Sequence, residues 1–243
     1  MKFLILLLLI IPLGTACSFA QDVYALSGGE IIFQSALVET TTDDVNTRLR
    51  FTTAFHLGEF VHIDFGNHFG IFSGMGIRNV GFITDENDIR TKYRSYSMGI
   101  PLAFKIGSFK KNMYVFAGGE YEWLFHFKQK VFIDEAKYKY SSWFSNRTSS
   151  FIPSAFAGLQ FPGGIQLKVK YYLNDFLNHE FNRGDEHNNY TLFRKTQVWY
   201  ISLSFLIRNK KTSVENANPP VQAAIFQLPY DQQKLYPFLP CCK

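Results

Sequence analysis

Two glutamates, Glu120 and Glu122, are the residues whose type and spacing point most directly to chemistry. They lie two positions apart and therefore share one face of an extended strand, as the acid and the base of a glycosidase could. Such catalysis also needs an open cleft, whereas buried charges persist mainly when they are paired. We therefore expect both glutamates to belong to a structural network of ion pairs.

A second group of titratable residues lies between positions 174 and 195. His179 and His187 lie there near the acidic residues Glu180, Asp185 and Glu186. Together they could surround a metal ion, but their spacing matches no standard set of ligands. A solvated loop accounts for them better, and we expect neither a metal nor a cofactor.

A third candidate is His126, which could work with a serine and an acid in an outer-membrane enzyme that modifies lipid. Ser95, Ser97 and Ser154 could approach it from neighbouring strands, but the chain has no serine two positions after His126. We therefore expect a non-enzymatic protein, with the lipid-modifying enzyme as an alternative.

Strands with a period of two are the elements that must position these side chains. In residues 113–128 the odd positions are apolar or small, and charged residues occupy even ones. Alternation of this kind gives a strand one apolar and one polar face. The same pattern recurs in residues 48–64, 165–173 and 199–205, and more weakly in residues 30–38, 69–83, 93–106 and 151–161.

These eight segments predict an all-β fold, an antiparallel up-and-down transmembrane β-barrel of about eight strands, an even number as bacterial barrels require. The connections support it because they alternate in length. The first, third, fifth and seventh span residues 39–46, 84–92, 129–149 and 174–195, whereas the others span only 66–68, 107–111 and 162–164. In outer-membrane barrels the short turns face the periplasm and the long loops face outward.

The ends of the chain differ from the barrel in composition. Residues 1–20 have a basic residue, an apolar core and a small-residue site, which predicts a secretory signal peptide cleaved before Gln21; a lipid anchor on Cys17 is a weaker alternative. Residues 21–208 form the predicted barrel of the bacterial outer membrane, and residues 209–243, rich in Pro and Asn, an irregular periplasmic tail. After cleavage Cys241 and Cys242 remain, which excludes a disulfide framework.

The net charge of +5 comes without a long basic run, so a membrane surface fits better than nucleic acid. If the apolar face of each strand meets lipid, the charged face fills the lumen, because eight strands enclose just enough space for side chains. The predicted lumen network comprises Arg48, Arg50, Asp64, Arg78, Lys105, Glu120, Glu122, His126, Lys168 and Lys170, together with His56, His62 and Lys128.

The connection over residues 129–149 carries more aromatic surface than a spacer needs, which favours recognition of a protein or glycan partner. Its predicted contact residues are Phe132, Tyr138, Tyr140, Trp143 and Phe144. Basic residues near the same end could contact the phosphates of lipopolysaccharide; they are Lys92, Arg94, Lys128, Lys130, Lys137 and Lys139. We therefore expect a barrel that binds a partner through its outer loops or its tail.

Alternation alone also fits a soluble lipocalin-like carrier, in which the apolar face turns inward around an apolar ligand and the charged face meets water. Loop parity, strand length and the export signal favour the membrane barrel.

Several segments together resemble a known family. They are the Ala20–Gln21 junction, the glycine-rich residues 69–76, residues 96–102 with the step Ile100-Pro101-Leu102, and the closing residues 201–205. They resemble the small outer-membrane barrels of Bacteroidetes, the porin-family or PorT-like proteins, over about residues 21–208. The resemblance implies an outer-membrane location. One branch of that family is associated with the type IX secretion apparatus, which leaves an accessory role in a secretion or uptake assembly open.

Overall fold

A computed structural model describes residues 21–41, 45–53, 55–86, 89–133, 136–184 and 189–209. The predicted signal peptide and the tail beyond Asn209 lie outside these residues. Strands dominate the described part, so the all-β prediction is confirmed, and none of its helices is long and apolar enough to cross a membrane. The strands are β1 (Gln21–Thr40), β2 (Asn46–Arg48), β3 (Arg50–Thr52), β4 (Leu57–Phe65), β5 (Phe69–Glu86), β6 (Ile89–Ser108), β7 (Met113–Ile133), β8 (Ala136–Trp143), β9 (Phe151–Gln160), β10 (Ile165–Tyr172) and β11 (Phe193–Arg208).

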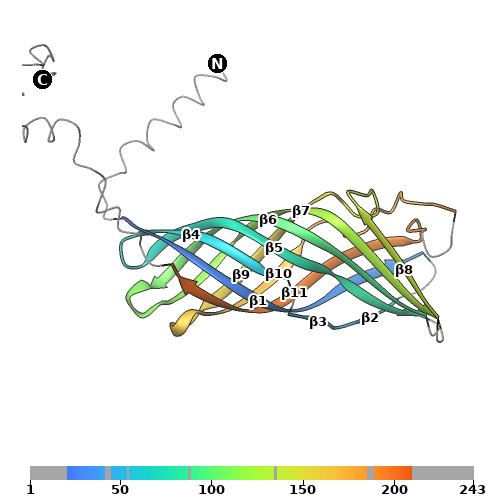
Figure 1. The fold of residues 1–243 in the computed structure, drawn as a ribbon. Helices are drawn as coiled ribbons and strands as arrows, with labels where there is room; N and C mark the ends of the chain where they lie inside the picture. Colours follow the sequence, from blue (N-terminus) through green and yellow to red (C-terminus); the bar gives the residue numbers. More distant parts are fainter. Residues whose placement is uncertain are drawn as a thin grey trace, which may run out of the picture. The chain divides into compact units, whose positions relative to one another are not determined.

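Eight of the strands close into a ring, which confirms the predicted eight-stranded barrel (Figure 1). Neighbours in the ring follow the order β11-β10-β9-β7-β6-β5-β4-β1, and all of these pairings are antiparallel. The first and last strands complete it, with a register that runs from Leu26 opposite Arg208 to Thr40 opposite Phe193. The predicted second strand is divided into β2, β3 and β4, of which β3 and β4 pair with β1, and β2 and β4 pair with β5.

Connections at the two ends of the barrel alternate along the chain (Figure 1). Residues 66–68 and the short 3-10 turns η1 (Phe109–Lys111) and η2 (Pro162–Gly164) lie at one end, which we call the short-turn end. The other, the long-loop end, carries the connections that follow β1, β5, β7 and β10. There the predicted loop over residues 129–149 proves to be largely a hairpin, because β7 continues to Ile133 and pairs with β8. The predicted long connection over residues 84–92 is also wrong and is a hairpin, because β5 continues to Glu86 and pairs with β6 from Ile89.

Side chains divide between the two faces of the wall as the alternation predicts. Large apolar residues point outward and are exposed, among them Leu102 at 57%, Val115 at 52% and Tyr121 at 57%. Polar and charged residues point inward and are buried. The interior is therefore charged where a lipocalin-like carrier would need it apolar, and this part of the carrier interpretation is wrong.

The interior has three layers, which follow one another along β7. Tyr114 and Phe116 belong to a group of buried rings near the short-turn end, which we call the inner aromatic cluster. Glu120 and Glu122 come next and form the charged middle. Phe127 belongs to a second, larger apolar cluster at the long-loop end. The charged layer is thus enclosed by aromatic packing on both sides.

A β-bulge in β7 changes which side chains point inward. Tyr96 lies opposite His126 but Ser97 lies opposite Leu124, so Phe125 has no partner on β6. One extra residue shifts the alternation by one. Beyond the bulge the odd positions point inward, and Phe127 is only 2% exposed. His126 therefore points to the outer face.

Candidate functional site

The charged middle of the lumen is centred on Arg78 of β5, whose guanidinium contacts carboxylates from two other strands. Its Nε donates to Glu30 Oε2 at 3.0 Å, and its Nη1 donates to Glu120 and lies 3.9 Å from Glu122 Oε1. The four side chains are at most 9% exposed. Arg78 therefore joins β1, β5 and β7 across the lumen.

Two lysines of β10 complete this network. Lys170 Nζ lies 2.7 Å from Glu120 Oε2 and also contacts Glu122, and Lys168 Nζ lies 2.6 Å from Glu30 Oε1. Three carboxylates thus face three cations, and the network is electrically balanced. Because each glutamate is held by cations in a closed interior, the glycosidase interpretation finds no open cleft here.

Hydroxyl groups satisfy the remaining oxygens of the network. Ser97 and Tyr172 donate to Glu122 at 2.6 and 2.8 Å, and Ser202 donates to Glu30 Oε1 at 2.7 Å. Gly99 on β6 leaves room for these contacts, because a Cβ at this position would collide with the carboxylate of Glu120. The network therefore fills the middle layer of the lumen as a structural element.

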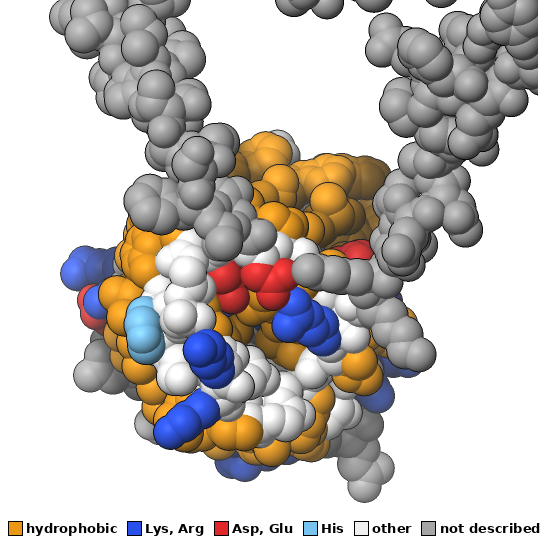
Figure 2. Space-filling model, turned by 90° about the vertical axis from the view of Figure 1, so that its left-hand side faces the viewer, with side chains coloured by type: hydrophobic (Ala, Val, Ile, Leu, Met, Phe, Trp, Pro, Cys, Tyr) orange, Lys and Arg blue, Asp and Glu red, His pale blue; other side chains and the backbone are white. Residues whose placement is uncertain are grey.

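A separate ion pair, Lys105 with Asp64, lies toward the short-turn end. Lys105 Nζ also donates to Tyr24 Oη at 2.9 Å and to His62 Nδ1 at 3.1 Å. Asp64 lines an open cavity of about 580 Å³ at this end. Figure 2 shows the hollow, with side chains of both charges around it.

The other predicted members of the lumen network lie elsewhere. Arg50 donates to Asn79 Oδ1 at 2.7 Å and is partly buried. Arg48 has a side chain that is 58% exposed and pairs with Asp85 at the long-loop end, and His126 lies on the outer face. Lys128 follows His126 on that face because of the same bulge.

Sequence reasoning missed Glu30, although it bonds both Arg78 and Lys168. It lies after two glycines in a segment of weak alternation. The alternation of β1 could have identified it. Glu30 occupies an even position of this strand, as does Gln34, which is fully buried.

The connection between β10 and β11 folds into the mouth of the barrel at the long-loop end. Its residues Phe176 and Tyr190 are 1% and 0% exposed. Arg147 Nη1 donates to Tyr190 Oη at 3.2 Å, and its guanidinium lies 4.7 Å from the centre of the Phe181 ring. Burial raises the pKa of Tyr190 to about 12. Its hydroxyl donates to Gln129 Oε1 at 2.6 Å.

The metal interpretation of this connection concerns residues that are described only in part. His179 Nε2 lies 3.4 Å from Thr196 Oγ1, whereas Asp185, Glu186 and His187 lie outside the described residues. Within the described part of the chain no group of three or more His, Cys, Asp or Glu side chains could hold a metal ion.

Rows of cations lie on the outer face of strands β6, β7 and β8, in the part that extends past the ring of eight strands at the long-loop end. Lys92 lies opposite Lys130, Lys130 lies opposite Lys139, and Arg94 lies opposite Lys128. Like charges directly opposite one another are destabilising. Partial burial, followed by the neighbouring cations, lowers the pKa of Lys130. We call Lys92, Arg94, Lys128, Lys130, Lys137 and Lys139 the basic face.

The ion pairs found among the described residues involve none of these six cations. Aromatic rings contact some of them. Lys92 and Lys137 lie 5.1 and 5.3 Å from the centre of the Phe132 ring, and Lys128 lies 5.6 Å from that of Tyr96. The basic face is thus concentrated positive charge with aromatic surfaces between its members.

A cluster of stacked rings lies next to the basic face, where β7 changes its partner from β9 to β8. The Trp143 ring lies parallel to that of His126 with 3.9 Å between centres, and Phe144 stacks on Trp123 at 5.7 Å. Trp143 and Phe144 are 60% and 67% exposed. We call Tyr96, Trp123, Phe125, His126, Trp143 and Phe144 the aromatic cluster.

The five residues predicted as one partner-binding surface are therefore divided. Trp143 and Phe144 belong to the aromatic cluster, and Phe132 lies between two lysines of the basic face. Tyr138 and Tyr140 alternate with the outward lysines of β8 and lie on its opposite face, where Tyr140 approaches Arg147. One-residue alternation separates them, although they are close in sequence.

The serine beside His126 is one that the sequence did not suggest. Ser141 Oγ lies 3.0 Å from His126 Nε2, whereas Ser95 donates to the carbonyl oxygen of His126. Ser97 and Ser154 bond to Glu122 and to the backbone of Glu120. No carboxylate of the described residues forms an ion pair with His126, so the third member of a catalytic triad is not found there.

No protein-family model matches the chain, and no curated protein matches its sequence. The solved structures to which it is similar include Ail, the attachment invasion locus protein of Yersinia pestis, at 13% identity, with 76% of this chain and 99% of that chain covered and a TM-score of 0.34. Neisserial surface protein A is similar at 8% identity over 77% and 98% of the chains, with a TM-score of 0.37. The outer membrane protein OprG of Pseudomonas aeruginosa is similar at 12% identity over 76% and 95%, with a TM-score of 0.35.

Proposed function

We propose that this chain is a non-enzymatic outer-membrane β-barrel whose basic face binds the phosphate groups of lipopolysaccharide. The exposed apolar wall supports a position in a bilayer. The long hairpins β5–β6 and β7–β8 and the connection between β10 and β11 support an orientation with the long-loop end outward. Export by a cleaved signal peptide over residues 1–20, and a place among the PorT-like barrels of Bacteroidetes, belong to the same proposal.

The observation that carries the proposal is the pairing of like charges across β6, β7 and β8. Repulsion between Lys92, Lys130 and Lys139 would be relieved by an anion placed over the row. Both Lys and Arg suit phosphate. The aromatic cluster lies next to this row, on the side of the short-turn end. Girdles of aromatic residues mark the membrane interfaces in outer-membrane barrels. Phosphates of the outer leaflet would then lie at the height of the cations.

Replacing Lys92, Lys130 and Lys139 together by Ala should weaken binding of the folded full chain to purified lipopolysaccharide at least tenfold, about 1.4 kcal/mol. Three cations that face one another lose their charge, and each contributes to the same anion site. Binding of the original chain should also weaken as salt is raised, because exposed charges are screened. Surface plasmon resonance with the barrel in nanodiscs measures both.

A matched control replaces Arg48, Arg90 and Lys195 by Ala. These cations lie at the same end, but they form ion pairs with Asp85 or Glu39. The control changes the net charge equally and should bind as the original chain does. An equal loss of lipopolysaccharide binding in both variants would show that binding depends only on the overall charge. Undiminished binding of enzymatically dephosphorylated lipopolysaccharide would favour an uncharged glycan or protein partner instead.

The contact between His126 and Ser141 allows the enzyme alternative to be tested directly. We expect His126→Ala to leave the mass spectrum of lipid A unchanged in cells that express the barrel, because the ring lies stacked between Trp143 and Tyr96 and has no acid partner in the described part of the chain. A lipid A species that depends on the barrel and disappears with His126→Ala would show catalysis. Ser141→Ala should then remove the same species.

A further inference from the structure

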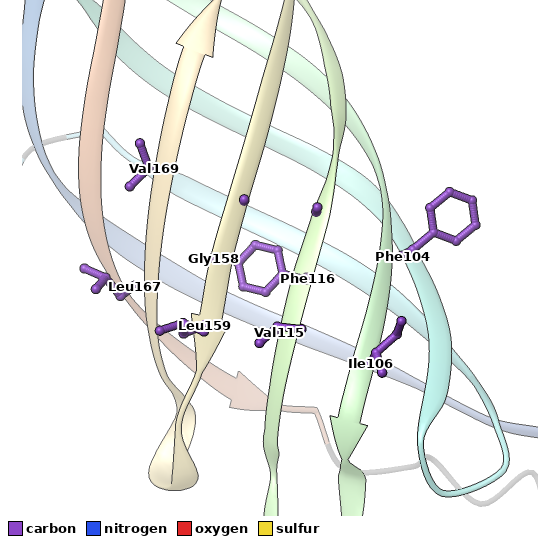
Figure 3. Close-up of a pocket in the computed structure, with 10 residues that line it drawn as sticks. Phe104, Ile106, Val115, Phe116, Gly158, Leu159, Leu167 and Val169 are labelled. Atoms are coloured by element: carbon purple, nitrogen blue, oxygen red, sulfur yellow. The ribbon is translucent and has the colours of Figure 1, made fainter.

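An apolar groove of about 570 Å³ lies on the outer wall toward the short-turn end, over strands β6, β7, β9 and β10. Figure 3 shows the side chains around it. Its lining is apolar throughout and consists of Phe104, Ile106, Val115, Phe116, Ala117, Ala157, Gly158, Leu159, Leu167 and Val169.

The groove exists because small residues meet across neighbouring strands. Ala117 lies opposite Ala157, with Phe104 beside one and Val169 beside the other. Directly opposite side chains are close neighbours on one face of a sheet, so two alanines between two larger residues leave a notch. The next row toward the long-loop end continues the notch, because Gly119 lies opposite Ala155.

The wall behind the notch is filled from the lumen side. Phe116 is 3% exposed and packs in the inner aromatic cluster, and its ring lies where a Cβ of Gly158 would be. The interior therefore has no room for the lining to collapse inward. The hollow can be filled only from outside the barrel.

Positive charge lies at the foot of the groove. The turn η1 joins β6 and β7. Their residues Ile106 and Val115 lie opposite each other at the edge of the groove that is nearer to the short-turn end. Two exposed lysines, Lys110 and Lys111, occupy this turn, and Lys110 also lines the open cavity at the short-turn end. The other two short turns, residues 66–68 and 162–164, contain neither Lys nor Arg. Apolar surface and cationic charge thus coincide at one of the three turns.

We propose that the groove holds an acyl chain of an anionic phospholipid from the leaflet at the short-turn end, with the lipid phosphate on Lys110 and Lys111. The proposal rests on the membrane location proposed above. An acyl chain fits because the groove is apolar and opens to the outside, and an anionic headgroup fits because basic residues at a membrane surface attract anionic lipid. The site lies at the opposite end of the barrel from the basic face.

Native mass spectrometry of the full chain, released from nanodiscs of phosphatidylglycerol and phosphatidylethanolamine in equal amounts, tests this. The original chain should retain phosphatidylglycerol. Ala117→Phe with Ala157→Phe should lower the retained fraction at least tenfold, because the rings occupy the notch. Lys110→Ala with Lys111→Ala should remove the preference for phosphatidylglycerol and leave some retention of either lipid.

Ala25→Phe is the matched control, since Ala25 lies on the outer face of β1, which is on the other side of the ring from β7, and should retain lipid normally. If the double phenylalanine variant does not fold, as judged by a heat-dependent gel shift, Ala157→Leu alone should still reduce retention. Equal retention by all folded variants would overturn the proposal. The proposal would also be overturned if the original chain showed no preference for phosphatidylglycerol. The same holds if the chain formed dimers that the phenylalanine substitutions dissociate. Insertion of the barrel into liposomes, measured in parallel, tests the membrane location independently.

Discussion

Replacing Arg78 by Leu should lower the free energy of unfolding by about 3–5 kcal/mol, since removal of one partner leaves a buried charge uncompensated. Arg78 is the cation shared by Glu30, Glu120 and Glu122, and the side chains of these glutamates are at most 9% exposed in the lumen. Two lysines would remain for three carboxylates. Urea titration of the barrel in liposomes, followed by the heat-dependent gel shift, measures the change.

Arg48→Leu is the control for this prediction. Arg48 also forms an ion pair, but its side chain is 58% exposed, and surface pairs contribute only about 0–1 kcal/mol. Combining Arg78→Leu with Glu120→Gln should recover part of the lost stability, because the second change removes one unpaired charge. Equal effects of Arg78→Leu and Arg48→Leu would mean that water reaches the network, and the lumen would then be open.

Replacing Leu102 by Arg should destabilise the barrel by about 2–4 kcal/mol in a bilayer, the cost of an arginine on the lipid face near the midplane. Leu102 is 57% exposed on β6 and lies six positions from Ser108, roughly half of the about 9–11 residues with which a tilted strand crosses a membrane. The charge would have to leave water for hydrocarbon. Urea titration in liposomes again gives the difference.

Leu192→Arg makes the same chemical change at a similarly exposed residue, 49%, in the connection before β11. It should change stability by less than about 0.5 kcal/mol, as surface substitutions usually do. If both arginines were equally harmless, the exposed wall would be in contact with water, and the proposed membrane location would fail together with the lipid groove.

The barrel and its charged lumen could be predicted because strand alternation is a strong and repeated signal. Glu120, Glu122, Lys168 and Lys170 share inward positions of two strands with regular alternation, and their pairing follows once the ring closes. The alternation of short turns with longer polar connections separated the two ends for a similar reason, although the connections predicted over residues 84–92 and 129–149 contain hairpins. Both are periodic properties, which a single sequence reveals well.

The predictions that are wrong concern side chains next to a point where one residue interrupts the alternation of a strand. The bulge at Phe125 turns His126 and Lys128 outward, and no local property of the segment 124–128 distinguishes a bulged strand from a regular one. A similar change between β2 and β3 leaves Arg48 outside while Arg50 reaches Asn79 inside. The hairpin of β7 and β8 was mistaken for a loop because its charged residues are frequent, although they alternate with Val131 and Tyr138.

The pairing of β1 with β11 also determines when the barrel can form. Residues such as Gly28 and Leu206 are adjacent in the ring but come from the two ends of the described chain. Contacts so distant in sequence form slowly, because loop-closure entropy precedes any gain from pairing. Glu30 meets Lys168 of β10 and Ser202 of β11 only after this step. Until β11 is synthesised and docked, β1 has an unpaired edge and its Glu30 lacks two of its partners. The nascent protein needs protection from aggregation for that whole interval.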